Sequence, residues 1–270
     1  MRNNRLQQLW REGGAAVNGW LTIPSSFSAE VMAHAGWTSI TVDMQHGLVD
    51  YQTMVTMLQA ISTTEAVPLV RVPWNDPGII MKSLDAGAFG VICPMVNSRE
   101  EAERLVGACK YPPAGYRSSG PVRAALYCGA DYQEHANTSV LAFAMIETKT
   151  AVERLDEILS TPGLDAVYLG PADLSFSLTG KFGFDHAEGT ICYNAIETIL
   201  AACKRHGVVA GIHTGSPEYA AKMIGLGFQF VSIGSDAKLL AGTAGDAVAR
   251  VRAIRDGKHE PASATSSAPY

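Results

Sequence analysis

The chain has 270 residues, of which 47% are hydrophobic and 17% charged, and its formal net charge is −5. The low charged fraction predicts an extensive buried core and excludes disorder for the bulk of the chain. The acidic balance and the scattered Lys and Arg residues argue against nucleic acid as a partner. No apolar run is long enough to span a membrane, and the N-terminus lacks the apolar core of a signal peptide. We therefore expect a soluble, cytoplasmic protein.

Eight short apolar runs rich in β-branched residues predict eight buried strands. In chain order these runs are Val17–Ile23, Ser39–Met44, Val67–Val72, Gly90–Met95, Leu141–Ile146, Ala166–Leu169, Val208–Ile212 and Phe230–Ile233. Apolar residues at helical spacing predict helices between and after them. These helices are Tyr51–Ile61, Asp76–Ala86, Arg99–Cys109, Ala151–Leu159, Asn194–His206, Pro217–Leu226 and Ala237–Ile254.

Continuous apolar strands are buried on both faces, which is typical of a parallel sheet covered by helices. Eight such units favour a (β/α)8 TIM barrel, with residues 1–256 as a single domain. The competing fold is a doubly wound sheet, but no G-x-G-x-x-G follows the first strand. Residues 257–270 are small and polar, and we expect them to form a disordered tail.

Polar residues at or just after the strand ends are the candidate site residues, because that face of a TIM barrel carries catalysis. They are Asp43, His46, Arg71, Glu147, Asp173, His213 and Asp236. For His213 a core or supporting role is preferred to one lining the mouth. Two connections are longer than the others, 111–139 and 175–190, and the second follows a strand directly, at the mouth.

Glu147 and Asp173 belong to the ends of adjacent predicted strands, so their carboxylates can converge. Two like charges so close need a cation or a shared proton, and a hard divalent ion satisfies them. Mg²⁺ or Mn²⁺ is favoured over zinc because no Cys or His pair lies nearby, and Co²⁺ is a third candidate. The alternative is that either acid pairs with a basic residue such as Lys149.

Arg71 lies in an otherwise apolar strand, where its guanidinium must be paired or used. It either binds a substrate carboxylate or an enolate oxygen, or forms a structural salt bridge. Asp43 and His46 leave one strand together, an arrangement in which a carboxylate orients an imidazole for acid–base work. His46 is therefore the candidate proton shuttle.

The turn Gly170-Pro171-Ala172-Asp173 can present the backbone N–H groups of Ala172 and Asp173 to a substrate carboxylate. No Lys falls inside a predicted strand, so a Schiff-base aldolase is not favoured and carbonyl chemistry is expected to need a metal. The absence of G-x-S-x-G argues against a serine hydrolase.

Taken together, these segments resemble the class II metal-dependent pyruvate aldolases of the 2,4-dihydroxyhept-2-ene-1,7-dioate aldolase type. That family includes macrophomate synthase and 2-keto-3-deoxy-rhamnonate aldolase. The matching segments, in family order, are Asn18-Gly19-Trp20, Asp43-Met44-Gln45-His46-Gly47, Pro68-Leu69-Val70-Arg71-Val72-Pro73, Tyr111-Pro112-Pro113-Ala114-Gly115-Tyr116-Arg117, Ile146-Glu147-Thr148 and Gly170-Pro171-Ala172-Asp173-Leu174.

The resemblance implies a phosphoenolpyruvate/pyruvate-type barrel that cleaves 4-hydroxy-2-keto acids to an aldehyde and pyruvate or hydroxypyruvate. It assigns the metal to Glu147 and Asp173, the enolate oxygen to Arg71, and catalysis to His46, with Asp43 as its orienting partner. The keto-acid carboxylate is expected at the amides of Ala172 and Asp173. The resemblance also implies a homohexamer, a trimer of dimers, in which the last helix, Ala237–Ile254, exchanges between subunits.

Two residues depart from the family pattern. Several members carry Gln where this chain has Met145, and members acting on sugar-acid products commonly carry Glu where it has Gln45. Three alternatives to an aldolase stay open. They are an oxaloacetate decarboxylase, a carbon–carbon lyase acting on a CoA thioester, for which the sequence offers no CoA groove, and a non-catalytic barrel that binds keto acids.

Overall fold

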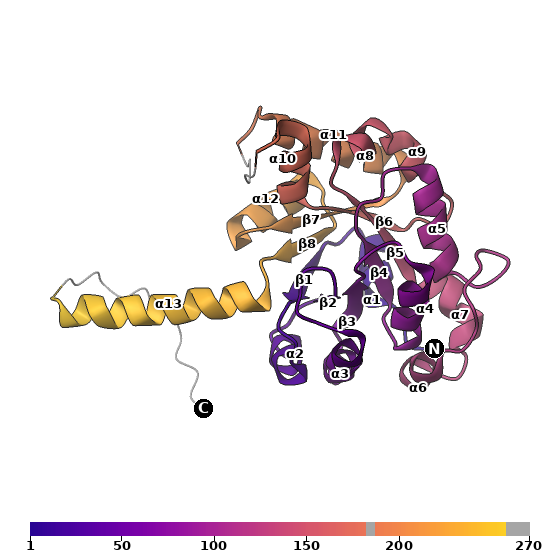
Figure 1. The fold of residues 1–270 in the computed structure, drawn as a ribbon, viewed down its shortest axis with the longest axis horizontal. Helices are drawn as coiled ribbons and strands as arrows, with labels where there is room; N and C mark the ends of the chain where they lie inside the picture. The colour runs from indigo at the N-terminus through magenta and orange to yellow at the C-terminus, as the bar shows by residue number, and fades with distance from the viewer. Residues whose placement is uncertain (182–186, 258–270) are drawn as a thin grey trace. The chain divides into compact units, whose positions relative to one another are not determined.

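The computed structural model describes residues 1–181 and 187–257. Eight parallel strands form a closed barrel in sequence order, and β8 pairs with β1 (Figure 1). The strands are β1 (Ala16–Leu21), β2 (Ser39–Asp43), β3 (Val67–Arg71), β4 (Gly90–Cys93), β5 (Leu141–Ile146), β6 (Ala166–Leu169), β7 (Val209–Thr214) and β8 (Phe230–Ile233). Each ends within two residues of a predicted run, so the (β/α)8 prediction is confirmed.

Helices connect the strands. They are α1 (Arg5–Arg11), α2 (Ser26–Ala33), α3 (Tyr51–Ile61), α4 (Pro77–Asp85), α5 (Arg99–Cys109), α6 (Val122–Cys128), α7 (Tyr132–Ser139), α8 (Lys149–Glu153), α9 (Leu155–Leu159), α10 (Pro171–Thr179), α11 (Ile191–His206), α12 (Pro217–Leu226) and α13 (Asp236–Arg255). None of those in the described ranges is long and apolar enough to cross a membrane.

One helix prediction was wrong, and further helices were not predicted. The expected helix Ala151–Leu159 is divided at Arg154 into α8 and α9. The connection 111–139 contains α6 and α7, and α10 extends into the connection 175–190, whose residues 182–186 lie outside the described part. These additional helices have seven to nine residues, too few for apolar spacing to identify them.

Side-chain caps start most of the helices on the barrel. A hydroxyl or carboxylate before the helix accepts the backbone N–H three residues later. The capping residues of this kind are Ser25, Asp50, Asp76, Ser98, Thr148, Thr190 and Ser216. Helix α10 differs, because it follows Gly170 and has no side-chain cap.

The barrel interior is packed in layers. At the N-terminal end of the strands, Trp10 of α1 meets Phe143 and Phe230 edge-on, with ring centroids 5.9 and 6.4 Å away. The Trp10 indole N–H also donates to the carbonyl of Gln229, just before β8. Trp10 therefore closes this end of the barrel and leaves the carboxyl end of the strands for a site.

Contacts divide the chain into Met1–Asp236, which contains the barrel, and a second unit that begins at Ala237. Most of α13 belongs to this second unit. Its large apolar side chains are 40 to 67% exposed, and they are Leu239, Leu240, Val248, Val251 and Ile254. Of the expected tail, residues 258–270 lie outside the described residues.

Candidate active site

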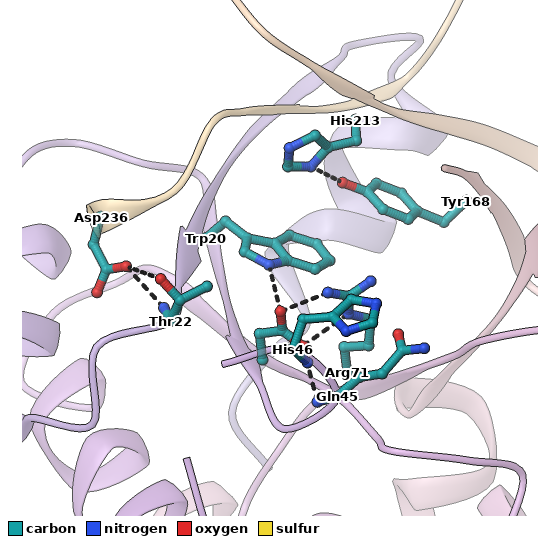
Figure 2. Close-up of polar contacts among 9 residues, drawn as sticks. Trp20, Thr22, Gln45, His46, Arg71, Tyr168, His213 and Asp236 are labelled. Atoms are coloured by element: carbon teal, nitrogen blue, oxygen red, sulfur yellow. Dashed lines mark hydrogen bonds and ion pairs between the residues drawn. The ribbon is translucent and has the colours of Figure 1, made fainter. Parts of the chain in front are cut away.

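Arg71 and Asp43 form a buried ion pair at the carboxyl ends of β3 and β2 (Figure 2). The register places the two residues opposite each other, and Arg71 donates from Nε to Asp43 Oδ1 at 2.8 Å and from Nη2 to Oδ2 at 2.5 Å. Burial acts to raise the pKa of Asp43, but the hydrogen bonds and charge of Arg71 hold that pKa below its usual value.

Asp43 holds the His46 segment through its backbone. Oδ1 accepts the backbone N–H of Gln45 at 3.0 Å and that of His46 at 3.3 Å. Over residues 1–181 and 187–257, no hydrogen bond joins the Asp43 carboxylate to the His46 ring, which is exposed. The structure thus pairs Asp43 with Arg71, and the expected contact with the imidazole is replaced by one with the peptide group of His46.

Trp20 completes this cluster, and the sequence analysis did not single it out as a site residue. Its indole N–H donates to Asp43 Oδ2 at 3.1 Å, and the Arg71 guanidinium carbon lies 4.8 Å from the indole centroid. Tyr168 stacks on the indole at 5.3 Å and an interplanar angle of 10°. A buried aromatic residue in a strand reads as ordinary core, so only the tertiary contacts reveal this role.

Glu147 follows β5 and is only 2% exposed. Its Oε1 accepts the backbone N–H of Met95 at 2.8 Å, and Met95 has a φ of 56°, an uncommon conformation for a residue other than glycine. Burial raises the pKa of Glu147 to about 7; the Met95 hydrogen bond opposes this rise, and the negative charge of Asp173 adds to it.

Asp173 lies in the first turn of α10. The Glu147 carboxylate lies close to Gly170, the residue that precedes this helix. A Cβ at Gly170 would stand 2.7 Å from Glu147 Oε2, so glycine lets that carboxylate reach the start of the helix. Pro171 occupies the first turn and Gly170 provides no cap, so an anion can approach the N–H groups of Ala172 and Asp173.

The donor set fits a hard divalent cation. Two carboxylates, one of them buried, repel each other until a cation neutralises them. The alternative pairing with Lys149 is not seen, since Lys149 lies 3.8 Å from Glu153. The described residues contain no group of three or more His, Cys, Asp or Glu that could hold a metal, so water and substrate would supply the remaining ligands, as Mg²⁺ prefers.

Both departures from the family pattern border this site. Met145 is 2% exposed, and its Cε would be 3.3 Å from a Cβ at Gly170, so an apolar group packs beside the carboxylates. Gln45 is half-buried, and within the described ranges its Oε1 has no hydrogen-bond partner.

Asp236, at the start of α13, has a different role. Its Oδ1 accepts the backbone N–H and hydroxyl of Thr22 at 2.8 and 2.9 Å (Figure 2). Its Oδ2 accepts the N–H of Ile23 at 3.2 Å. This candidate therefore anchors the segment that follows β1.

Comparison with known proteins identifies the family of this barrel. Residues 19–242 match the model of the HpcH/HpaI aldolase/citrate lyase family, and the chain belongs to that family. It is 39% identical to a hydroxypyruvate/pyruvate aldolase of Rhizorhabdus wittichii over 251 residues, which are 93% of this chain and 100% of that protein.

Two further proteins support the family assignment. A 4-hydroxy-2-oxo-heptane-1,7-dioate aldolase of Klebsiella pneumoniae is 36% identical over 88% of this chain and 90% of its own. The crystal structure of a family member from Burkholderia cenocepacia superposes with a TM-score of 0.86 at 31% identity, covering 93% of this chain and 100% of that one. The resemblance deduced from the short motifs is thus confirmed at the level of the family.

Proposed function

We propose that the protein cleaves 4-hydroxy-2-keto acids reversibly to an aldehyde and pyruvate or hydroxypyruvate, with Mg²⁺ or Mn²⁺ as its cofactor. The observation that carries this proposal is the pair Glu147 and Asp173 at the uncapped start of α10, where Glu147 is buried with a pKa raised to about 7. The activities named for the two aldolases of Rhizorhabdus wittichii and Klebsiella pneumoniae support it.

The keto acid would bind at the beginning of α10. Its carboxylate would accept the N–H groups of Ala172 and Asp173, where the positive end of the helix dipole favours an anion. Glu147 and Asp173 would hold the divalent ion, which when bound supplies Lewis-acid polarisation of the keto group. Because Gly170 has no Cβ, the Glu147 carboxylate can lie close to the start of α10, so the ion and the keto-acid carboxylate would bind side by side.

Arg71 would stabilise the negative charge that develops on the keto oxygen during cleavage. Asp43 and Trp20 hold the guanidinium in place before substrate arrives, so little reorganisation is needed when the enolate forms. His46 would take the proton of the C4 hydroxyl in cleavage and return it in synthesis. Because Asp43 binds both Arg71 and the backbone of His46, one carboxylate sets the positions of both groups.

Solvent deuterium exchange into the methyl group of pyruvate tests the enolate step directly. We expect exchange that requires Mg²⁺ or Mn²⁺, is abolished by excess EDTA, and is lost in Glu147→Gln. A binding module would show no exchange, and full activity in metal-free protein would contradict the proposal. Release of CO₂ from oxaloacetate without an aldehyde would identify a decarboxylase, and assays with CoA thioesters would identify a lyase of that class.

We also propose a homohexamer in which α13 exchanges between subunits, and a location in the cytoplasm. The exposed apolar side chains of α13 support a partner for this helix. The five cysteines are buried and free, in keeping with a reducing compartment. Light scattering measures the assembly: a monomeric mass would contradict the hexamer, and Val251→Glu with Ile254→Glu should reduce the mass observed.

A further inference from the structure

A chain of hydrogen bonds crosses the barrel interior and begins at Asn18, a residue that the proposed chemistry does not use. Asn18 is fully buried, and its Oδ1 accepts the hydroxyls of Ser39 at 2.8 Å and Thr41 at 3.2 Å. The Asn18 amide group also donates from Nδ2 to Ser232 Oγ, 3.0 Å away.

The chain of hydrogen bonds continues from Ser232 through Tyr168 to His213. Ser232 Oγ accepts from Asn18 and hydrogen-bonds the Tyr168 phenol oxygen; burial raises the pKa of Tyr168, and this bond from Ser232 opposes the rise. The Tyr168 hydroxyl and His213 Nδ1 lie 3.0 Å apart, and the tautomer of His213 decides which of them donates (Figure 2). A neutral imidazole that accepts at Nδ1 carries its proton on Nε2.

The aromatic neighbours fix the position of the His213 ring. Trp20 stacks on Tyr168 and meets His213 edge-on at 5.5 Å and 82°. A Cβ at Gly211 would lie 2.9 Å from the Phe230 ring and 3.1 Å from the Tyr168 ring, so this glycine makes room for the phenol. His213 is the partly exposed end of a chain whose other members are buried.

His213 lies at the level of the reacting groups. Tyr168 and Leu169 pair with Gly211 and Ile212, so the same register brings His213 opposite Gly170, where Glu147 approaches α10. Neighbouring strands are about 4.8 Å apart. In the proposed function α10, Arg71 and the divalent ion bind the oxygens of the keto acid. The oxygens of the aldehyde are therefore the substrate atoms that His213 could contact.

We propose that His213 is a specificity-determining residue that donates its Nε2–H to an oxygen substituent of the aldehyde, a hydroxyl or carboxylate near the carbonyl. The inference rests on the proposed function. In this proposal Tyr168 donates to Nδ1, so His213 carries its proton on Nε2 and acts as a donor.

The test compares two aldehydes of similar size, glycolaldehyde and propanal, with pyruvate and the Mg²⁺-loaded enzyme. In His213→Phe, which keeps an aromatic ring beside Trp20 but removes the donor, kcat/KM for glycolaldehyde should fall about tenfold relative to propanal, as expected for one hydrogen bond. Equal losses on both aldehydes, or no loss on either, would overturn the role of His213.

Two NMR measurements test the position of the His213 proton and its dependence on Tyr168. Nitrogen NMR of the histidine-labelled holoenzyme should show His213 protonated on Nε2, and protonation on Nδ1 would overturn the inference. In Tyr168→Phe, which keeps the ring stacked on Trp20, a mixture of both His213 tautomers should appear. An unchanged tautomer would contradict the inference that Tyr168 sets the position of the His213 proton. Absence of metal-dependent deuterium exchange into pyruvate by the wild-type enzyme would instead contradict the proposed function.

Discussion

Arg71 donates two hydrogen bonds to the carboxylate of Asp43 across the neighbouring strands β3 and β2, and both side chains are buried. The salt-bridge alternative considered for Arg71 is thus observed. Binding of a substrate oxygen by the same guanidinium is part of the proposed function.

Replacing Asp43 should affect stability as well as activity. In Asp43→Asn the buried guanidinium loses its counter-charge, and we expect the free energy of unfolding to fall by about 3 kcal/mol. Urea denaturation measures this loss. The matched control is Asp156→Asn, which removes an exposed partner of Arg205 and should change stability little. An equally small effect of Asp43→Asn would contradict a strong buried pair.

Trp20 should act on the rate through Arg71. Trp20→Phe keeps an aromatic face for Arg71 and Tyr168 but removes the indole N–H that binds Asp43. We expect kcat to fall about tenfold, because the loss of one buried hydrogen bond loosens the Arg71 position that matters in the transition state. Steady-state kinetics with pyruvate and an aldehyde measure this change. A rise in KM with unchanged kcat would argue against it.

Gly170 should control metal affinity. The methyl group of Gly170→Ala would clash with Glu147 Oε2, so the carboxylate must move away from the start of α10. We expect Mn²⁺ to bind at least about tenfold more weakly, the effect of about 1.4 kcal/mol, by calorimetric titration. Gly225→Ala is the matched control, since a Cβ there meets nothing within 4 Å. Equal Mn²⁺ affinities of the two variants would contradict the expected clash between the methyl group of Gly170→Ala and Glu147.

The raised pKa of Glu147 gives a pH dependence with a definite sign. In metal-free protein the folded value of about 7 exceeds the ordinary 4.5, so this group's contribution to stability is fully present below pH 4.5 and is lost as the pH rises towards 7. Mg²⁺ binds the ionised form, so it should raise the melting temperature more at pH 8 than at pH 6. In Glu147→Gln, both pH effects should disappear; their persistence would assign them to another group.

The barrel could be predicted because the strands are short runs rich in apolar and β-branched residues and most long helices show apolar spacing. The site was predictable only in part. Asp43 was assigned to the His46 ring because the two are close in sequence, whereas the register of β2 and β3 puts Asp43 opposite Arg71. The bond from Met95 to Glu147 comes from a peptide group, so no side-chain pattern could indicate it.

Trp10, packed against Phe143 and Phe230, has a kinetic consequence. Trp10 closes the barrel at the N-terminal ends of the strands, so substrates and products would enter and leave at the carboxyl ends. In the proposed function the keto acid would bind at α10, deeper in the barrel than the aldehyde, so the aldehyde would leave before pyruvate. Accumulated pyruvate should then inhibit cleavage by competing with the keto acid, which initial-rate kinetics with added pyruvate would show.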